Sequence, residues 1–546
     1  MLTELFADAS LDSVTGMVKP YNKPDRMDDR MRKSDFARLH VPDEHCFESL
    51  HHQWSLSSHP LQTSTLSFWD TFEWGLWFSG YLLYRCNNRY SLSEYHDGWL
   101  ENRLLEEQAQ SRRRFWHEFE TEAMRKALQS PLGLRGLAMV AEGMFRRQQW
   151  DLRNTSGKVV CRLELSSVLE AKHGRTLLQS CQLHPLRGYE KEAQEVLACL
   201  TGHGASPCVQ HPVELLLSQA DNQPRRYSLR PACGLNASTP AREAIARIVG
   251  VMLELAAANL PGMQQDLDTE FLHDYRICLR KIRSLLSLIK GVYPAEDLQR
   301  IRTILGDLAR QTNRLRDLDV YLLAREEHLG LLPSSFRPAL SRMFDDFAVE
   351  REKEIHRVVS KKSLSAARRL LDIVSISCNN NELSGYAPAA ELPVGPLVFS
   401  AIYRRYRKIV KISGSIGAAT PDAEIHRLRI ECKKMRYLME FFYELIPADA
   451  GATVLKQLRR LQTKLGEFND ASVQQHSLLA YWDQRKPDAE IALGLGGLVS
   501  VLYQRQQQSR RLIEQSLHEF CSASTAALFR QTFKLPASAS GITVYR

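Results

Sequence analysis

Two stretches of the chain carry a histidine followed by cations at helical spacing. They read FLHDYRICLRKIRSLL at residues 271–286 and HRLRIECKKMRYLMEF at residues 426–441. On a helix, side chains three and four positions apart share a face. The resulting stripes are His273, Arg276, Arg280 and Arg283 in the first stretch and His426, Arg429, Lys433 and Arg436 in the second, with Lys281 and Lys434 flanking them. Guanidinium forks, ammonium groups and imidazoles suit phosphate oxygens.

The likeness between the two stretches extends beyond the cations. Asp317 in NRLRDLD follows His273 by 44 residues, and Asp470 in GEFND follows His426 by the same 44. Matching positions differ by 153 throughout, since 273 + 153 = 426 and 317 + 153 = 470. We therefore expect a duplicated helical unit with pseudo-two-fold symmetry.

A cationic stripe opposite an apolar face is also typical of a solvated helix surface. Such surfaces usually mix charges, because like charges three or four residues apart repel each other. Here no acid enters either stripe before Glu440, which favours an anionic ligand over plain solvation. A third basic run, YRRYRKIVK, supplies Arg404, Arg407 and Lys408 as further candidates.

The elements that must position these residues are helices in the second half of a multidomain chain. We expect a loose N-terminal segment (1–45), an α+β domain (46–230), an all-α domain (240–522) with repeats at about 240–392 and 393–522, and a flexible tail (523–546). Runs such as TSTLSFWD, YLLYR, VVCRLELSS and RRYSLR predict strands, and residues 101–128 and 189–200 predict helices. Pro261, Pro294, Pro333 and Pro447 predict helix breaks.

The charge of the chain is concentrated in its helical half. The 546 residues hold 72 Lys+Arg and 63 Asp+Glu; residues 241–546 account for 44 and 34 of these, an excess of +10, and residues 1–240 for 28 and 29. An uneven basic surplus indicates a polyanionic partner for that half.

Other features exclude several classes of protein and site. Eleven cysteines without a CxxC pair favour reduced thiols in the cytoplasm. We find no export signal and no apolar run that predicts a membrane span or a membrane partner. Phosphate-loop, dinucleotide and zinc-protease motifs are missing, so we expect no cofactor. His45, Cys46, His51 and His52 match no standard metal spacing, and we expect no metal there.

The two stretches, together with LRDLD and LQTKLGEFND, resemble the CHAD domain, the conserved histidine α-helical domain, over residues 240–522. The resemblance implies two related helical bundles around a basic groove that binds inorganic polyphosphate, a location at cytoplasmic polyphosphate granules, and other granule proteins as partners. It implies that the residues of both stripes and the flanking Lys281 and Lys434 face the ligand, with Arg316 and Lys464 as additions.

SFWDTFEWGLWFSGYLLYR, residues 67–85, resembles the CYTH or triphosphate tunnel domain. We find no ExExK strand, which supplies that family's metal ligands, and Arg85 is one residue out of phase, which turns it to the other face of a strand. We therefore expect a degenerate, tunnel-like antiparallel β domain that is not an enzyme. Two alternatives stay open: a metal-dependent triphosphatase in this domain, and RNA or DNA binding by the helices. The second is disfavoured because the stripes lack interleaved aromatic residues other than Tyr437.

Overall fold

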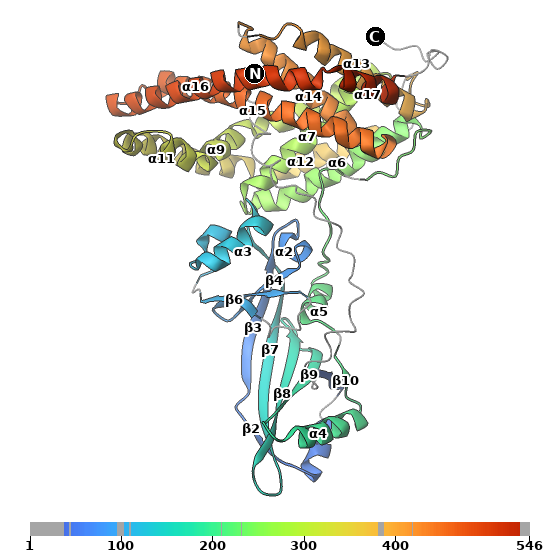
Figure 1. Cartoon of the computed structure of the whole chain (residues 1–546), viewed down its shortest axis with the longest axis vertical. Coiled ribbons are helices and arrows are strands. Elements are labelled where there is room, and N and C mark those ends of the chain that lie inside the picture. Colours follow the sequence, from blue (N-terminus) through green and yellow to red (C-terminus); the bar gives the residue numbers. More distant parts are fainter. Residues whose placement is uncertain are drawn as a thin grey trace. The chain divides into compact units, whose positions relative to one another are not determined.

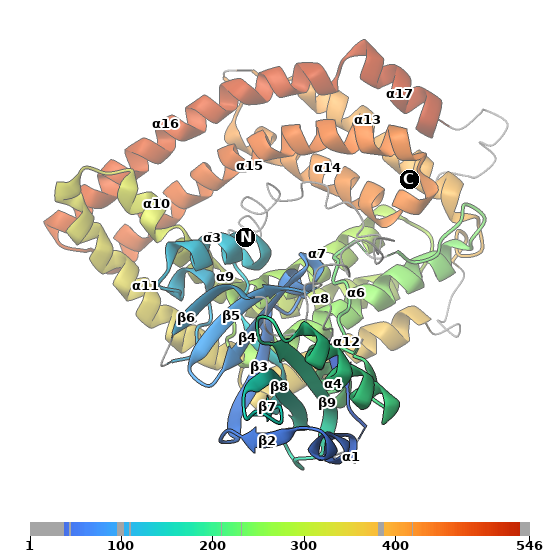
Figure 2. The ribbon, with the colours of Figure 1, turned by 60° about the horizontal axis from the view of Figure 1, so that its bottom comes forward.

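The computed structural model describes residues 38–42, 45–95, 103–108, 111–208, 210–230, 232–379, 387–417 and 419–534. These residues form two compact units that divide between Tyr227 and Ser228 (Figures 1 and 2). Most of the expected lead-in (1–45) and residues 535–546 of the expected tail lie outside the described residues, whereas Ala523–Phe533 of that tail forms a helix with Phe529 and Phe533 buried.

An antiparallel sheet organises the first unit (Figure 1). Its strands are β1 (Leu39–His40), β2 (Ser55–Ser58), β3 (Gln62–Asp70), β4 (Tyr81–Cys86), β5 (Arg89–Glu94), β6 (Arg103–Gln108), β7 (Ala138–Arg153), β8 (Val159–Glu170), β9 (Thr176–Pro185) and β10 (Ser206–Pro207). They are ordered β10-β1-β9-β8-β7-β3-β4-β5-β6, and β2 pairs with β7. Polar and apolar side chains alternate as a half-buried sheet requires: Arg162 is exposed and Leu163 is buried.

Short helices complete the first unit. They are α1 (His45–Glu48), η1 (Ser49–His52), α2 (Gly75–Phe78), η2 (Trp116–Glu118), α3 (Glu122–Leu132), α4 (Glu190–Gly202) and α5 (Pro212–Gln219). The apolar side of α4 packs on β8 and β9, and α5 packs on β7 and β8. The strands expected from TSTLSFWD, YLLYR and VVCRLELSS and the helix at 189–200 are confirmed. RRYSLR, however, is not a strand, and residues 101–128 contain β6, η2 and the first part of α3 in place of one helix.

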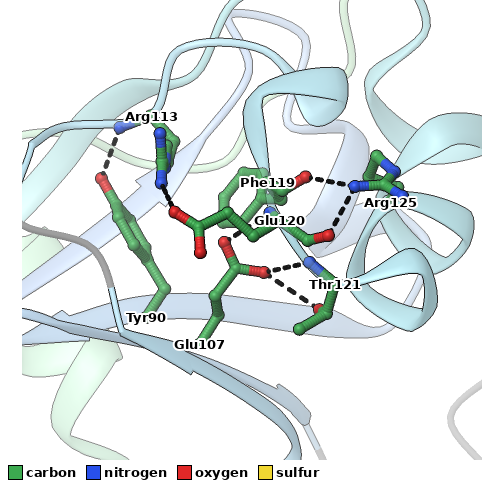
Figure 3. A network of polar contacts seen from close by, with 7 residues as sticks. All are labelled: Tyr90, Glu107, Arg113, Phe119, Glu120, Thr121 and Arg125. Carbon is green, nitrogen blue, oxygen red and sulfur yellow. Dashed lines mark hydrogen bonds and ion pairs between the residues drawn. The ribbon is translucent and has the colours of Figure 1, made fainter.

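Two buried carboxylates in this unit hold the starts of helices. Asp70 accepts hydrogen bonds from the backbone N–H groups of Thr71, Leu76 and Trp77, at 2.7–2.9 Å. Burial raises the pKa of Asp70 to about 6, against the effect of these hydrogen bonds. Glu107 accepts from the backbone of Glu120 and from both the backbone and hydroxyl of Thr121 (Figure 3). Asp70 therefore has a structural role at the start of α2.

The second unit is all helical in its described residues (Figure 2). Its helices are α6 (Ala241–Gln264), α7 (Thr269–Leu288), α8 (Ala295–Gln311), α9 (Asn313–Leu323), α10 (Arg325–Gly330), η3 (Ser334–Phe336), α11 (Arg337–Val358), α12 (Lys361–Asn379), α13 (Val394–Ser413), α14 (Asp422–Phe441), η4 (Tyr443–Leu445), α15 (Ala448–Arg485), α16 (Ala489–Phe520) and α17 (Ala523–Phe533). Pro294 and Pro447 precede helices as expected, whereas α6 continues through Pro261 to Gln264. The sequence thus predicts an antiparallel sheet region followed by helices, and both are present.

The segments that lead into α6 and α13 hydrogen-bond to each other. Pro240 and Pro393 form an isolated antiparallel bridge. Four backbone hydrogen bonds surround it, each 2.9–3.0 Å long: Val394 N to Thr239 O, Ala241 N to Leu392 O, Gly395 N to Ala237 O, and Arg242 N to Ala390 O. A Cβ at position 395 would lie 2.9 Å from the Ala237 Cβ, so this close approach requires glycine.

Helix α6 is an exception to the prediction that no apolar run is long enough to span a membrane. Its length and composition meet the criteria for crossing a membrane, and half of its apolar window is buried inside the structure. A core helix of a helical domain meets the same criteria. Met252 and Ala256, for example, are fully buried.

Candidate polyanion-binding site

The first cationic stripe lies on α7, whose start is fixed by Asp268. The Asp268 carboxylate accepts hydrogen bonds from the backbone N–H groups of Glu270 and Phe271. His273 and Arg276 are buried, and Arg280 and Arg283 are half-buried. Arg276 donates from Nη1 to the Ala309 carbonyl at 2.8 Å and to the Thr312 hydroxyl at 2.7 Å. The stripe of α7 therefore faces α8 and the start of α9.

Arg316 on α9 lies in the same region. Its side chain is buried, and Nε and Nη1 make no hydrogen bond with any described residue. Glu270, Asp274 and Asp319 act on it as nearby negative charges, and Arg280 as a nearby positive charge. Burial lowers the pKa of Arg316, which the acids partly oppose. A guanidinium remains charged under such conditions, so this one keeps its capacity to donate hydrogen bonds.

The second stripe lies on α14 and faces α15. His426 Nδ1 lies 2.7 Å from Asn469 Oδ1, and Arg429 Nη2 lies 3.6 Å from Asp470 Oδ1. Arg429 is buried and Lys433 is half-buried. Asn469 occupies the position that matches Arg316, since 316 + 153 = 469. The second stripe therefore meets an amide where the first meets a guanidinium.

Helices α7 and α14 pack together at the end of both stripes. Arg280 Nε donates to the Tyr437 hydroxyl at 3.1 Å, and Lys281 Nζ lies 3.1 Å from Glu440 Oε2. Arg436 and Arg230 approach the other carboxylate oxygen of Glu440, at 3.5 and 3.0 Å. Burial by itself would raise the pKa of Glu440, but these three cations outweigh it and hold the pKa low. This junction is a buried ionic cluster that ties the stripes to each other.

Lys281 Nζ also donates to the Leu229 carbonyl, at 3.0 Å. Its ammonium lies 5.8 Å from the ring centres of both Tyr437 and Phe441. Three kinds of contact thus fix Lys281 inside the packed helices. Lys434, which matches Lys281 in the second half, is half-buried, and its Nζ lies 3.6 Å from Glu431 Oε1.

The third basic run lies on α13. Arg404, Arg407 and Lys408 are exposed. Lys408 pairs with the buried Glu431 of α14 at 2.9 Å, and Arg405 contacts the same carboxylate. Burial alone would raise the pKa of Glu431, but its hydrogen bonds with Lys408 and Arg405 hold the pKa below the ordinary range. Lys464, on α15, pairs with Glu467 at 2.8 Å.

A cluster of possible metal ligands lies at the start of α7. One ligand atom from each of Glu270, His273 and Asp274 lies within 4.8 Å of the others, and all three residues are buried. Arg316 lies among the same carboxylates. A guanidinium that already balances their charge favours an ionic network over a metal site.

Sequence reasoning missed the groups that meet the cations from other helices. Glu440 and Glu431 carry a local signal, because they lie at helical spacing from Arg436 and Lys434. Asn469 and Tyr437 carry none, because each meets its partner through tertiary packing. Direct ligand contact by the stripe residues stays a prediction.

Three comparisons with known proteins bear on this unit. Residues 247–479 match the family model described as the CHAD domain. Two uncharacterized proteins of Mycobacterium tuberculosis, from strains CDC 1551 and H37Rv, are each 27% identical to this chain over 225 residues. The match covers 38% of this chain and only 39% of each relative.

The solved structures that match this chain have lower sequence identity. The CHAD domain from the plant Ricinus communis is 24% identical, with a TM-score of 0.44, covering 52% of this chain and 93% of that one. PptA from Streptomyces chartreusis is 17% identical, with a TM-score of 0.38, covering 51% of this chain and 99% of that one. The family match is the informative result, because it assigns the similarity to the CHAD domain to residues 247–479 of this chain.

Proposed function

We propose that the helical unit binds inorganic polyphosphate along the two cationic stripes. The observation that carries this proposal is the junction of α7 and α14, where Arg280 of one stripe is held by Tyr437 of the other helix. CHAD domains are associated with polyphosphate binding in general, and the basic excess of this chain falls in the helical half.

The binding we propose is electrostatic. Cations on the protein replace the counterions that surround a linear polyanion, so affinity should fall steeply with salt, as it does for nucleic acids. One long chain that reaches both stripes should bind more tightly than two short chains, because its second contact is intramolecular.

We also propose that the unit is a duplication with a pseudo-two-fold axis between its halves. The bounds of α7 and α14 differ by 153 at both ends, since 269 + 153 = 422 and 288 + 153 = 441. The bridge between Pro240 and Pro393 joins residues that also differ by 153. The surrounding backbone hydrogen bonds form two pairs that exchange under this shift: Val394 to Thr239 becomes Ala241 to Leu392. A two-fold axis would produce such a pattern.

For the first unit we propose a tunnel-like fold that has lost its metal site. Its antiparallel sheet and the placement of Asp70 at the start of α2 support this assignment. A triphosphatase remains the rival function. Release of phosphate from triphosphate by the whole chain with Mg²⁺ or Mn²⁺ would favour the rival, and no release above a metal-free blank would count against it.

The test of polyphosphate binding compares three forms of the full chain at two salt concentrations. The first is wild type, and the second carries Arg280→Glu with Lys433→Glu. The third carries Arg302→Glu with Arg511→Glu, which makes the same charge change at exposed positions outside both stripes. We expect tight, salt-sensitive binding that is lost only in the stripe variant, with helical content unchanged. Equal binding by the stripe and control variants would refute the proposed site.

Competition separates polyphosphate from nucleic acid. We expect RNA to displace labelled polyphosphate poorly, because stripes without stacking residues gain little from bases. Association with polyphosphate granules in the cytoplasm, and with other granule proteins, forms part of the proposal. Fluorescence microscopy of the tagged full chain and its stripe variant tests it.

A further inference from the structure

Arg316 and Asp317 are neighbours on α9, and each has buried side-chain atoms that make no hydrogen bond with a described residue. Only 5% of Arg316 is exposed, and its Nε and Nη1 make no hydrogen bond with a described residue. The Asp317 Oδ1 is buried and also makes no hydrogen bond with a described residue. A buried polar group without a partner costs free energy, so two adjacent ones indicate that something else completes the site.

The matching residues in the second half have side-chain contacts, although the Asp470 Oδ2 is also buried and makes no hydrogen bond with a described residue. Asp470 matches Asp317, and its Oδ1 lies 3.6 Å from Arg429 Nη2. Asn469 matches Arg316 and contacts His426. The buried guanidinium beside this acid is therefore particular to the first half, because the second half has the Asn469 amide at that position.

Positive groups surround Asp317. Arg276 reaches it from α7, and Arg314 and Arg316 from α9 itself, while the Tyr321 phenol faces it from the next turn. From α11, which packs on α9, Glu350 accepts two hydrogen bonds of 2.6 and 2.7 Å from Arg314, and Arg351 donates to Asp319 at 2.7 Å. Arg316 in turn faces Glu270, Asp274 and Arg280 of α7 and Asp319 of α9.

The three arginines around Asp317 suit an anion that arrives together with a proton. A phosphoryl group can use the donors of Arg316 and Arg276, but a charged Asp317 beside it would repel it. A protonated Asp317 would remove the repulsion and donate its O–H to a phosphate oxygen.

We propose that Arg276, Arg316 and Asp317 form a proton-coupled phosphate subsite, in which one phosphoryl group binds the two guanidinium groups and Asp317 takes up a proton from solvent. This inference rests on the proposed function and assigns one phosphate-binding position to the first half of the helical unit. The reaction is a simple protonation, in which one carboxylate and one proton give one carboxylic acid.

The direction of the pH effect follows from the state of Asp317 before binding. Burial raises the pKa of Asp317 to about 7, although Arg276, Arg314 and Arg316 lower it. A bound phosphate raises the pKa further, because its negative charge disfavours the carboxylate. Binding is then tightest below pH 7 and weakens as the carboxyl loses its proton. The internal groups of a long polyphosphate keep their charge over this range.

The experiment measures affinity of the full chain for long polyphosphate at pH 6 and pH 8 and constant salt. We expect the affinity of wild type to fall about tenfold from pH 6 to pH 8, the equivalent of one pKa unit. Asp317→Asn should bind with nearly the same affinity at both values, near the tight limit. Asp470→Asn is the matched control and should keep the wild-type pH dependence. Calorimetry at pH 7 in two buffers of different ionisation enthalpy should show proton uptake in wild type only.

The outcomes distinguish this inference from the proposed function. Binding by Asp317→Asn with the full wild-type pH dependence would assign the effect to His273 or His426 and overturn the subsite. Absence of polyphosphate binding by wild type at both pH values would refute the proposed function and the subsite together.

Discussion

Helices α7 and α14 carry the same order of cations, yet their surroundings differ. In the second half Asn469, Glu440 and Lys464 occupy the positions that in the first half belong to Arg316, Ser287 and Gln311. The second half thus places a carboxylate at the helix junction and an amide beside its histidine. The first half instead places a buried guanidinium beside its stripe. A shared pattern of cations therefore determines a shared face, whereas the neighbouring helices determine how much of that charge is already balanced.

The largest effect is expected for Glu440→Ser, which replaces Glu440 by the residue type of the matching position, Ser287. This change leaves Lys281 and Arg436 buried without their carboxylate, which should lower the free energy of unfolding by about 3–5 kcal/mol. Urea denaturation of the full chain measures it. The matched control, Ser287→Ala, should stay within about 0.5 kcal/mol of wild type. A small effect of Glu440→Ser would mean that the junction contributes little to stability.

The second prediction concerns how the free energy of unfolding depends on pH. Folded Asp317, with its pKa of about 7, holds a proton that the unfolded chain has lost above pH 4, so its contribution to stability falls as pH rises from about 4 to 7. In Asp317→Asn, the free energy of unfolding should change less with pH than in wild type, by about 2–4 kcal/mol between pH 5 and pH 8. Thermal unfolding at pH 5 and pH 8 checks it. Asp70 and Asp319, whose pKa values are raised to about 6, act in the same direction and remain in the variant.

Arg316→Asn replaces Arg316 by the residue type of the matching position, Asn469. This variant tests whether the buried guanidinium makes the first half bind polyphosphate differently from the second. Loss of hydrogen bonds from a charged donor should cost about 1.5–3 kcal/mol of binding free energy, which is tenfold or more in affinity. The slope of log affinity against log salt should fall by about one. Titration at several salt concentrations measures both. Unchanged affinity and slope would exclude Arg316 from the ligand site.

The smallest effect is expected at Lys464. Its ion pair with Glu467 is partly exposed and spans three residues of one helix, so Lys464→Gln should change stability by only about 0.2–0.5 kcal/mol. Affinity for polyphosphate should fall less than threefold. A loss as large as that of Arg316→Asn would show that the second half binds the ligand as strongly as the first.

The parts of the structure that follow from local pattern could be predicted from the sequence. Helical spacing identifies the faces of α7 and α14, and Pro294 and Pro447 mark helix starts, because these signals act within a few residues. β6 was missed because RLLEEQ has strong helix formers, and pairing with β5 overrides that preference. RRYSLR alternates like a strand but pairs with no described strand.

The partners of the site residues were the hardest to predict. Nothing local to Lys281 indicates that its ammonium meets Glu440, which lies 159 residues further on, since 440 − 281 = 159. The unsatisfied atoms of Arg316 and Asp317 likewise depend on α7 and α11, which pack against α9. Tertiary packing decides such contacts, and a single sequence holds no record of it.

The backbone hydrogen bonds around Pro240 and Pro393 bear on the order in which the chain can fold during synthesis. Ala241 at the start of α6 bonds to Leu392, so the ribosome must add about 150 residues before that helix gains its anchor. Contacts of such long separation also slow folding in general. The first half of the helical unit therefore emerges early but completes its structure late, which lengthens the interval in which a chaperone can reach its apolar face.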